Sequence, residues 1–122
     1  MNRLIKLVVF VGLLCFPMRI EAQYQLIELA DVQLAKSLSA TIQAPTGAPV
    51  MKAVVQEFSA DWKNVLRLGS TDTHGRFSFA PAQGRTIYFI QISAPGFDPL
   101  RFRLHVDTKR GERLKLKLTV AT

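Results

Sequence analysis

Two segments near the C-terminal end constrain the fold more strongly than any other part of the chain. Residues 100–106 read LRFRLHV and residues 114–120 read LKLKLTV, so apolar and polar side chains alternate in both. Because successive side chains of a strand point to opposite faces, this alternation predicts two β-strands with one buried face each. A slip of one residue in the second segment would bury Lys115 and Lys117, so its register is strongly specified.

Five further segments rich in β-branched and aromatic residues precede these two strands. Turn signals separate them, for example APTGAP at 44–49 and APAQG at 80–84, where proline and glycine favour chain reversal. Seven half-buried strands at this spacing, without a convincing helix, predict an all-β fold of two facing sheets, a small β-sandwich. The five expected segments are 38–43, 53–58, 65–68, 76–79 and 86–93.

The first 22 residues differ from the rest of the chain. MNRLIK is basic, residues 7–16 are uncharged and apolar, and Ala22 offers a small residue before cleavage at Gln23. This order is typical of a secretory signal peptide. The apolar run is about half the ~20 residues that a membrane-spanning helix needs. We therefore expect an exported protein, periplasmic or secreted, without a transmembrane span in the mature chain; an uncleaved N-terminal anchor is the alternative.

The only cysteine, Cys15, lies inside this predicted signal peptide. Leu14 precedes it, where a bacterial lipoprotein has a small residue, so lipidation is not expected. A mature chain without cysteine has neither disulfide nor thiol chemistry. Residues 23–36 fit no single period and are expected to be an N-terminal arm or an extra edge strand. Residues 37–122 then form the sandwich domain.

Basic residues are concentrated near the C-terminal end. The full chain has 16 Lys and Arg against 9 Asp and Glu, a net charge of +7. Removal of residues 1–22 takes away three basic residues and one acidic residue, which leaves 13 against 8 and a net charge of +5. Seven of these 13 follow residue 100. The candidate binding residues are the polar side chains of the two alternating strands: Arg101, Arg103, His105, Arg113, Lys115 and Lys117.

Two interpretations of these basic residues stay open. They bind an anionic partner, such as an acidic polysaccharide or lipid head groups, or they protect edge strands against aggregation. If the two strands pair as a hairpin they form one basic face, and if they lie in different sheets they form two. Nucleic acid is not expected as a partner, because the interleaved apolar residues face the core and cannot stack on bases.

The segment STDTHGRFSF at 70–79 brings an acid, a histidine and hydroxyls together. A metal site needs three or four converging ligands, and a Ser70–His74–Asp72 triad would need a base between nucleophile and orienting acid. Alternate residues of one tight loop supply neither a converging set of metal ligands nor the geometry of a triad. The segment is therefore interpreted as a turn made by Asp72 and Gly75, as Gly96 makes a later turn. His74 has no evident structural role.

Trp62 lies in the polar loop SADWKN at 59–64. An exposed tryptophan stacks on a sugar or anchors a protein partner. The alternative is that it folds back over the open end of the sandwich.

Several motifs occur in order along the chain: TGAPV at 46–50, AVV at 53–55, TDTHGRFSF at 71–79 and SAPGF at 93–97, followed by a closing alternating strand. Together they resemble the carboxypeptidase regulatory-like domain over about residues 37–120. The chain departs from that pattern at Ala40, where the family often has glycine, and at 51–52, where small residues are usual. The resemblance implies a seven-stranded, transthyretin-like Greek-key sandwich, with a starch-binding-like sandwich as the alternative.

Members of that family are generally non-catalytic and accompany other proteins. We therefore expect an exported accessory module without enzyme activity or cofactor, which binds or scaffolds an envelope protein or a polysaccharide. The alternatives are a carbohydrate-binding module that uses Trp62, and a small-ligand-binding oligomer or loop-site hydrolase of the transthyretin-like type.

The predicted cleavage after Ala22 determines the mass of the exported protein. Intact mass spectrometry should show residues 23–122, or the same chain less ammonia if Gln23 cyclises. A mass that retains residues 1–22 would contradict the signal-peptide prediction.

Overall fold

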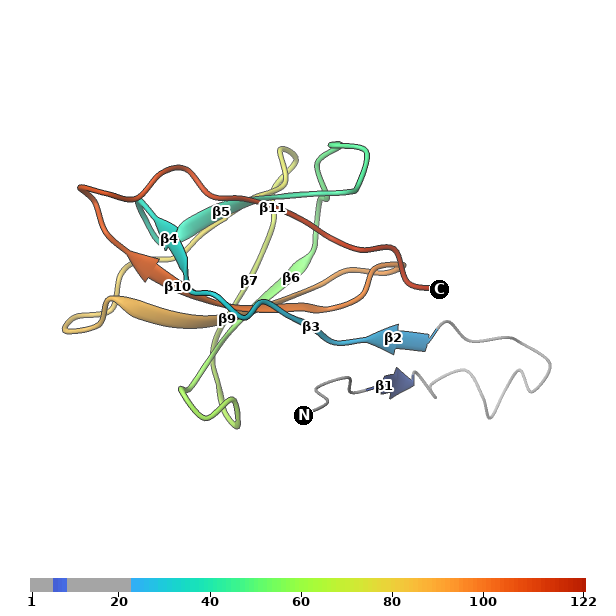
Figure 1. Cartoon of the computed structure of the whole chain (residues 1–122), viewed down its shortest axis with the longest axis horizontal. Helices are drawn as coiled ribbons and strands as arrows, with labels where there is room; N and C mark the ends of the chain where they lie inside the picture. The colour runs from blue at the N-terminus through green and yellow to red at the C-terminus, as the bar shows by residue number, and fades with distance from the viewer. Residues whose placement is uncertain (1–5, 9–22) are drawn as a thin grey trace.

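Two β-sheets pack face to face in the computed structural model, which describes residues 6–8 and 23–122 (Figure 1). The described residues contain no helix, so the prediction of an all-β sandwich is confirmed. The larger sheet has the order β3-β10-β9-β6-β7, with β4 also paired to β10. Its strands are β3 (Ile27–Glu28), β4 (Gln33–Ala35), β6 (Val54–Phe58), β7 (Val65–Ser70), β9 (Ile87–Ser93) and β10 (Leu100–Val106). The smaller sheet has the order β11-β5-β8, with β11 (Lys115–Lys117), β5 (Ser39–Gln43) and β8 (Arg76–Ser78).

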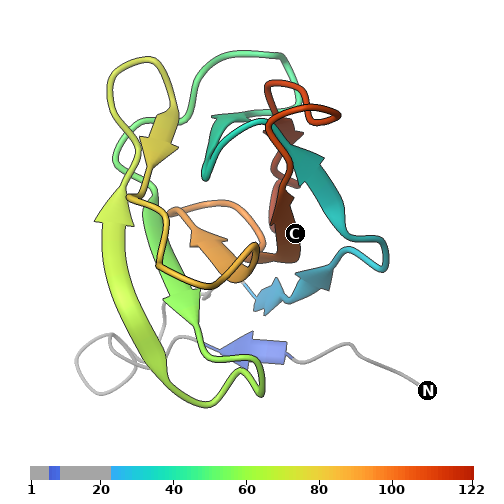
Figure 2. The ribbon, with the colours of Figure 1, turned by 90° about the vertical axis from the view of Figure 1, so that its left-hand side faces the viewer.

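The buried core side chains lie between the two sheets, whose strands are seen from one end in Figure 2. The inward positions follow the predicted alternation. Each fully buried aliphatic or aromatic side chain contributes about 1.5–3 kcal/mol. The core residues with less than 5% exposure on β5, β9 and β10 and just before β5 are Leu38, Ala40, Ile42, Tyr88, Ile90, Ile92, Leu100, Phe102 and Leu104.

The two alternating C-terminal segments lie in different sheets. β10 pairs antiparallel with β9, whereas β11 pairs parallel with β5 in the opposite layer. The second strand is also shorter than the predicted 114–120. Leu116 and Leu118 are buried, but Val120 is 52% exposed, because the chain leaves β5 after Leu118 and forms an isolated bridge with Phe97.

Residues 23–36 form short strands. β2 (Gln23–Gln25) is anchored by a hydrogen bond from the Gln25 backbone N–H to the buried Asp98 carboxylate, at 3.0 Å. β3 and β4 then run parallel to β10 and cover its outer edge. β10 is therefore an interior strand of its sheet, with neighbours on both sides.

Within the predicted signal peptide, the structure describes only β1 (Lys6–Val8), which pairs antiparallel with β2. The predicted cleavage site after Ala22 lies outside the described residues. In the described part of the chain, no helix is long and apolar enough to cross a membrane.

The two sheets meet at one corner through Ala35. This residue pairs with Val106 of β10 and bridges to Glu112, which leads into β11. Gly111 makes the approach possible, since a Cβ there would lie 2.3 Å from the Ala35 carbonyl carbon and oxygen. A side chain at position 111 would therefore push the two sheets apart.

A buried ion cluster closes one end of the sandwich. Glu57, on the inward face of β6, is fully buried. Its Oε1 accepts a hydrogen bond from Arg67 Nε at 2.6 Å, and its Oε2 lies 2.8 Å from Arg85 Nη1. Both arginines keep part of their side chains in water, 30% for Arg67 and 39% for Arg85. The carboxylate thus holds a strand and a connecting loop together.

Aromatic rings complete this cluster. The Arg67 guanidinium lies 4.9 Å from the ring centre of Phe79, and that of Arg85 lies 5.1 Å from the ring centre of Tyr88. The Tyr88 hydroxyl donates to the Arg85 carbonyl and accepts from the Ala82 N–H, both at 2.9 Å. The loop between β8 and β9 is therefore fastened over the end of the core by ionic, aromatic and polar contacts.

Substitution of Glu57 by Gln should lower the free energy of unfolding by about 2–3 kcal/mol, measured by urea denaturation. This is less than the ~3–5 kcal/mol typical when one partner of a fully buried pair is removed, because both arginines reach water. The matched control is Arg110→Gln, which breaks an exposed ion pair with Asp107 and should cost at most about 1 kcal/mol. Equal effects of the two substitutions would contradict a structural role for the buried cluster.

Candidate functional site

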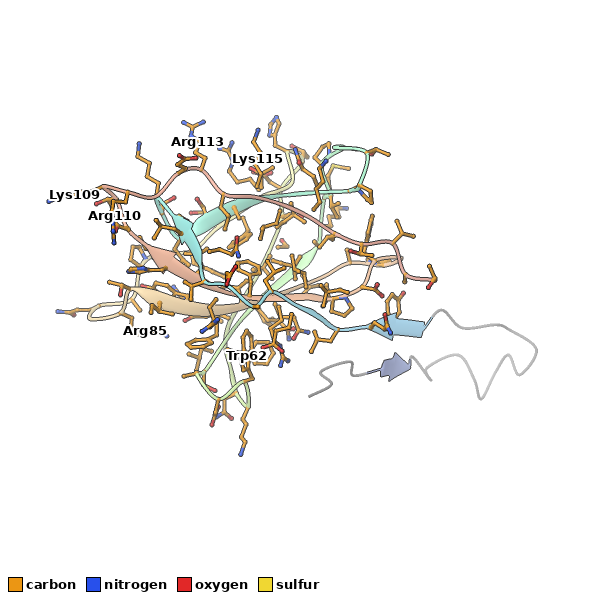
Figure 3. The ribbon with its side chains drawn as sticks, in the orientation of Figure 1. Trp62, Arg85, Lys109, Arg110, Arg113 and Lys115 are labelled. Carbon is orange, nitrogen blue, oxygen red and sulfur yellow. The ribbon has the colours of Figure 1, made fainter. Side chains whose placement is uncertain are left out.

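The outer face of the larger sheet carries three aromatic rings and one guanidinium in contact. Trp62 packs against Phe58 and Phe89, with ring-centroid distances of 5.5 and 5.4 Å. The Arg101 guanidinium lies 4.2 Å from the centre of the Trp62 ring and 5.6 Å from that of Phe58. We name these four residues the aromatic–arginine cluster. It brings together Trp62, at the lower side of Figure 3, and Arg101, two residues that the sequence had singled out separately.

Strand register places these side chains on one face. Phe58 of β6 lies directly opposite Phe89 of β9, and Arg101 of β10 lies opposite Gln91 of β9. Since Tyr88 and Ile90 are buried in the core, the residue between them must point outward. The same alternation that builds the core therefore assembles the cluster on the opposite face.

Trp62 is held over the sheet by the loop between β6 and β7. The Asp61 carboxylate accepts hydrogen bonds from the Ser59 hydroxyl at 2.6 Å and from the Lys63 backbone N–H at 3.0 Å. These bonds lower the pKa of Asp61 from its ordinary value, and the Ser59 hydroxyl makes the larger contribution. The carboxylate is therefore ionised at neutral pH and holds the loop in place. The Trp62 backbone N–H donates to the Ser59 carbonyl at 2.8 Å.

The backbone of Trp62 adopts a left-handed conformation, with φ of 64°. A bulky residue in this region costs about 1–3 kcal/mol. The ring contacts of the aromatic–arginine cluster offset that cost, since aromatic pairs contribute about 0.5–1.5 kcal/mol each beyond their buried area. The loop and the cluster therefore stabilise each other, and the indole is presented in a single orientation.

Arg101 is oriented by its neighbours as well as by the rings. Its Nε and Nη2 donate to Gln91 Oε1 at 3.1 and 2.9 Å. Partial burial lowers the pKa of the guanidinium from its ordinary value, and nearby Glu28 acts in the opposite direction. A partly desolvated guanidinium over an aromatic face gains about 1–2 kcal/mol. The positive charge is thus held in one position on an interior strand of the sheet.

Exposed apolar side chains surround the cluster. Val54 and Leu68 lie on the same face of β6 and β7 and are 45% and 67% exposed. Ile87 lies opposite His105 and is 42% exposed, and Leu34 of β4 also pairs with His105. The outer face of the larger sheet therefore combines aromatic rings, aliphatic side chains and a fixed positive charge.

The six predicted basic-strand residues divide between two faces. Arg101, Arg103 and His105 lie on the outer face of the larger sheet, and Arg103 donates to the Ala30 carbonyl. Because β10 is an interior strand, edge protection does not account for these residues. The other three are on or next to β11, an edge strand of the smaller sheet: Arg113, Lys115 and Lys117.

The segment around Asp72 has the geometry of a turn. The Asp72 carboxylate accepts hydrogen bonds from the backbone N–H groups of Arg76 at 3.0 Å and His74 at 2.8 Å, which lower its pKa. Gly75 has φ of 76°, and a Cβ there would lie 2.5 Å from the Ile42 carbonyl oxygen. Gly96 likewise has a positive φ, of 86°, at the turn before β10. The His74 side chain makes no hydrogen bond or ion pair within the described residues.

No group of three or more His, Cys, Asp or Glu side chains that could hold a metal ion is found in the described residues. No protein-family model matches the sequence, and no curated protein matches it either. The resemblance to the carboxypeptidase regulatory-like domain therefore stays a prediction.

Sequence reasoning missed most of the contacts of this site. Phe58 and Phe89 occupy outward positions of their strands, where a polar residue is the usual choice, and this departure from alternation is the signal that could have found them. Gln91 gave no such signal. Its pairing with Arg101 depends on the register between β9 and β10, which the sequence alone does not supply.

The chain has a single tryptophan, so its fluorescence reports directly on the cluster. Substitution of Arg101 by Ala should shift the emission of Trp62 to longer wavelength and increase quenching by acrylamide, because the guanidinium no longer covers the indole. The free energy of unfolding should fall by about 1 kcal/mol.

The matched control is Arg103→Ala, on the same strand and face, whose guanidinium lies over no aromatic ring of the described residues. It should leave the emission wavelength and the quenching unchanged. Identical spectra for the Arg101 and Arg103 variants would contradict the described packing.

Proposed function

We propose that the protein is a non-catalytic binding module that docks a protein partner on the outer face of its larger sheet. The observation that carries this proposal is the aromatic–arginine cluster, which is preorganised by its loop and surrounded by exposed aliphatic side chains. Aromatic residues and arginine are enriched at protein interfaces, and they supply much of the binding energy there.

The geometry favours a protein partner over a sugar. A sugar stacks on a free aromatic face, whereas the Arg101 guanidinium lies over one face of the Trp62 ring at 4.2 Å. The edge contact with Phe89 and the tilted contact with Phe58 restrict the indole further. Leu68 and Ile87 also expose aliphatic surface on this face. The apolar side chains of a protein partner would cover this surface better than the hydroxyl groups of a carbohydrate.

The charge of this face indicates what the partner presents. Arg101 and Arg103 lie two residues apart, with His105 next on the same strand face. The nearby acid is Glu28, which pairs in register with Arg101. A complementary partner would therefore bring an apolar surface that carries at least one carboxylate toward β10.

We extend the proposal to family and location. The seven strands β5 to β11 divide into β7-β6-β9-β10 and β11-β5-β8, with two hairpins in the first sheet and crossings between the layers. This arrangement supports the proposed transthyretin-like Greek-key sandwich and a relation to carboxypeptidase regulatory-like domains. The signal-like residues 1–22 support export, so the proposed partner is an envelope or secreted protein.

Site-directed photo-crosslinking in the producing organism tests the proposed docking face. A benzophenone amino acid replaces Leu68 or Ile87 on the larger sheet, or the exposed Ser78 on the smaller sheet as the matched control. We expect a discrete protein adduct from the first two positions and none from Ser78. The additional substitution Arg101→Ala should reduce the adduct yield severalfold.

A glycan array probed with the same protein tests the alternative function, a carbohydrate-binding module. Saturable sugar binding that is abolished by Trp62→Ala, with no protein adduct at Leu68 or Ile87, would overturn the proposal in favour of a carbohydrate-binding module. Equal crosslinking from all three positions would show that the larger sheet has no special role.

A further inference from the structure

The outer face of the smaller sheet contains a polar groove that is independent of the aromatic–arginine cluster. Its volume is about 360 Å³. It lies over β5, on the side of the sandwich opposite Trp62, where Figure 3 shows Arg113 and Lys115 projecting from the upper strands. The polar side chains that line it are Lys36, Ser37, Ser39, Thr41, Arg76 and Arg113.

The groove arises where two chain segments separate before they pair. The Lys36 N–H donates to the Glu112 carbonyl and the Thr41 N–H donates to the Leu114 carbonyl, both at 2.9 Å. Between these two bonds, one segment has four residues (37–40) and the other has one, Arg113. The longer segment must therefore arch away from the shorter one, and the arch leaves a hollow beside Ser37 and Ser39.

The charge of the groove has one sign. Lys36, Arg76 and Arg113 are exposed cations, and no carboxylate lines the hollow. Two acids are close in sequence to these cations: Asp72, whose carboxylate accepts hydrogen bonds from the N–H groups of His74 and Arg76, and Glu112, which precedes Arg113. None of the three cations forms an ion pair within the described residues, and they repel one another, so an anion between them would relieve that repulsion.

Hydroxyl groups complete the lining. The Ser37 and Ser39 Oγ atoms lie 2.7 Å apart and hydrogen-bond to each other, and Thr41 follows two residues later on the same strand face. A hydroxyl can rotate to donate to an anionic oxygen. The groove therefore offers both charge and directional donors.

We propose that this groove binds a phosphate group, either free or as the head group of a lipid. Phosphate carries up to two negative charges and several acceptor oxygens, so it can engage two arginines and a hydroxyl together, whereas one carboxylate satisfies fewer donors. Lys115 and Lys117 extend the positive face along β11, an edge strand. Edge protection accounts for these two lysines, but it does not account for the hydroxyl-lined hollow over the central strand.

The test is a titration of the ¹⁵N-labelled protein with sodium phosphate at constant ionic strength, with sodium chloride as the reference. We expect saturable amide shifts confined to residues 36–41, 76 and 113–114. Arg76→Gln and Arg113→Gln should each weaken binding about tenfold, as expected for loss of a hydrogen bond to a charged group. Lys63→Gln, which removes an exposed cation from the β6–β7 loop, should change affinity less than twofold.

Vesicles distinguish the two sources of phosphate. Sedimentation with phosphatidylglycerol vesicles that is weakened in the two arginine variants identifies a lipid head group, and phosphate binding without sedimentation identifies free phosphate. Either result supports the groove.

Absence of both, or affinities of the Arg76 and Arg113 variants equal to that of Lys63→Gln, would overturn the proposal. Thermal unfolding of each variant establishes that it is folded, and the shifts of the unsubstituted protein locate the site independently. The photo-crosslinks from Leu68 and Ile87 lie on the other face, so either proposal can fail without the other.

Discussion

The alternation of apolar and basic side chains along β10 determines both the core and the outer face of the larger sheet. Its inward residues, Leu100, Phe102 and Leu104, lie at the centre of the core. Its outward residues, Arg101 and Arg103, place positive charge on the opposite face of the sheet. Because β9 lies on one side and β3 and β4 on the other, these arginines lie on an interior strand and not on an edge strand. One strand therefore specifies both the packing and the candidate recognition face.

The aromatic–arginine cluster shows how a strained loop becomes ordered. Trp62 has an unfavourable backbone conformation, and its loop is short and exposed. Hydrogen bonds to the Asp61 carboxylate hold the loop from one side, and Arg101 with the two phenylalanines holds the indole from the other. The entropy of ordering these side chains is lost on folding, so a partner that binds here meets a surface that is already arranged.

Much of the sandwich follows from local pattern, whereas the sites depend on long-range register. Alternation and turn residues predict the strands, and they predict that Ile42, Phe77 and Leu116 are buried. They do not reveal that residues 100–106 and 114–120 lie in different sheets. Both segments have the same period, and their apolar side chains would be buried whether the two strands shared a sheet or not. Glu57 occupies an inward position that the pattern reserves for apolar residues, and it is stabilised by Arg67 and Arg85, 10 and 28 residues away. Contacts of this kind depend on which strands become neighbours.

Ring-current shifts in the proton NMR spectrum would show whether the Arg101 guanidinium lies on the Trp62 ring in solution. We expect the Arg101 side-chain protons to resonate well upfield of their ordinary positions, with nuclear Overhauser contacts to the indole, and both features to vanish in Trp62→Leu. Ordinary shifts for Arg101 in the folded, unsubstituted protein would contradict this contact.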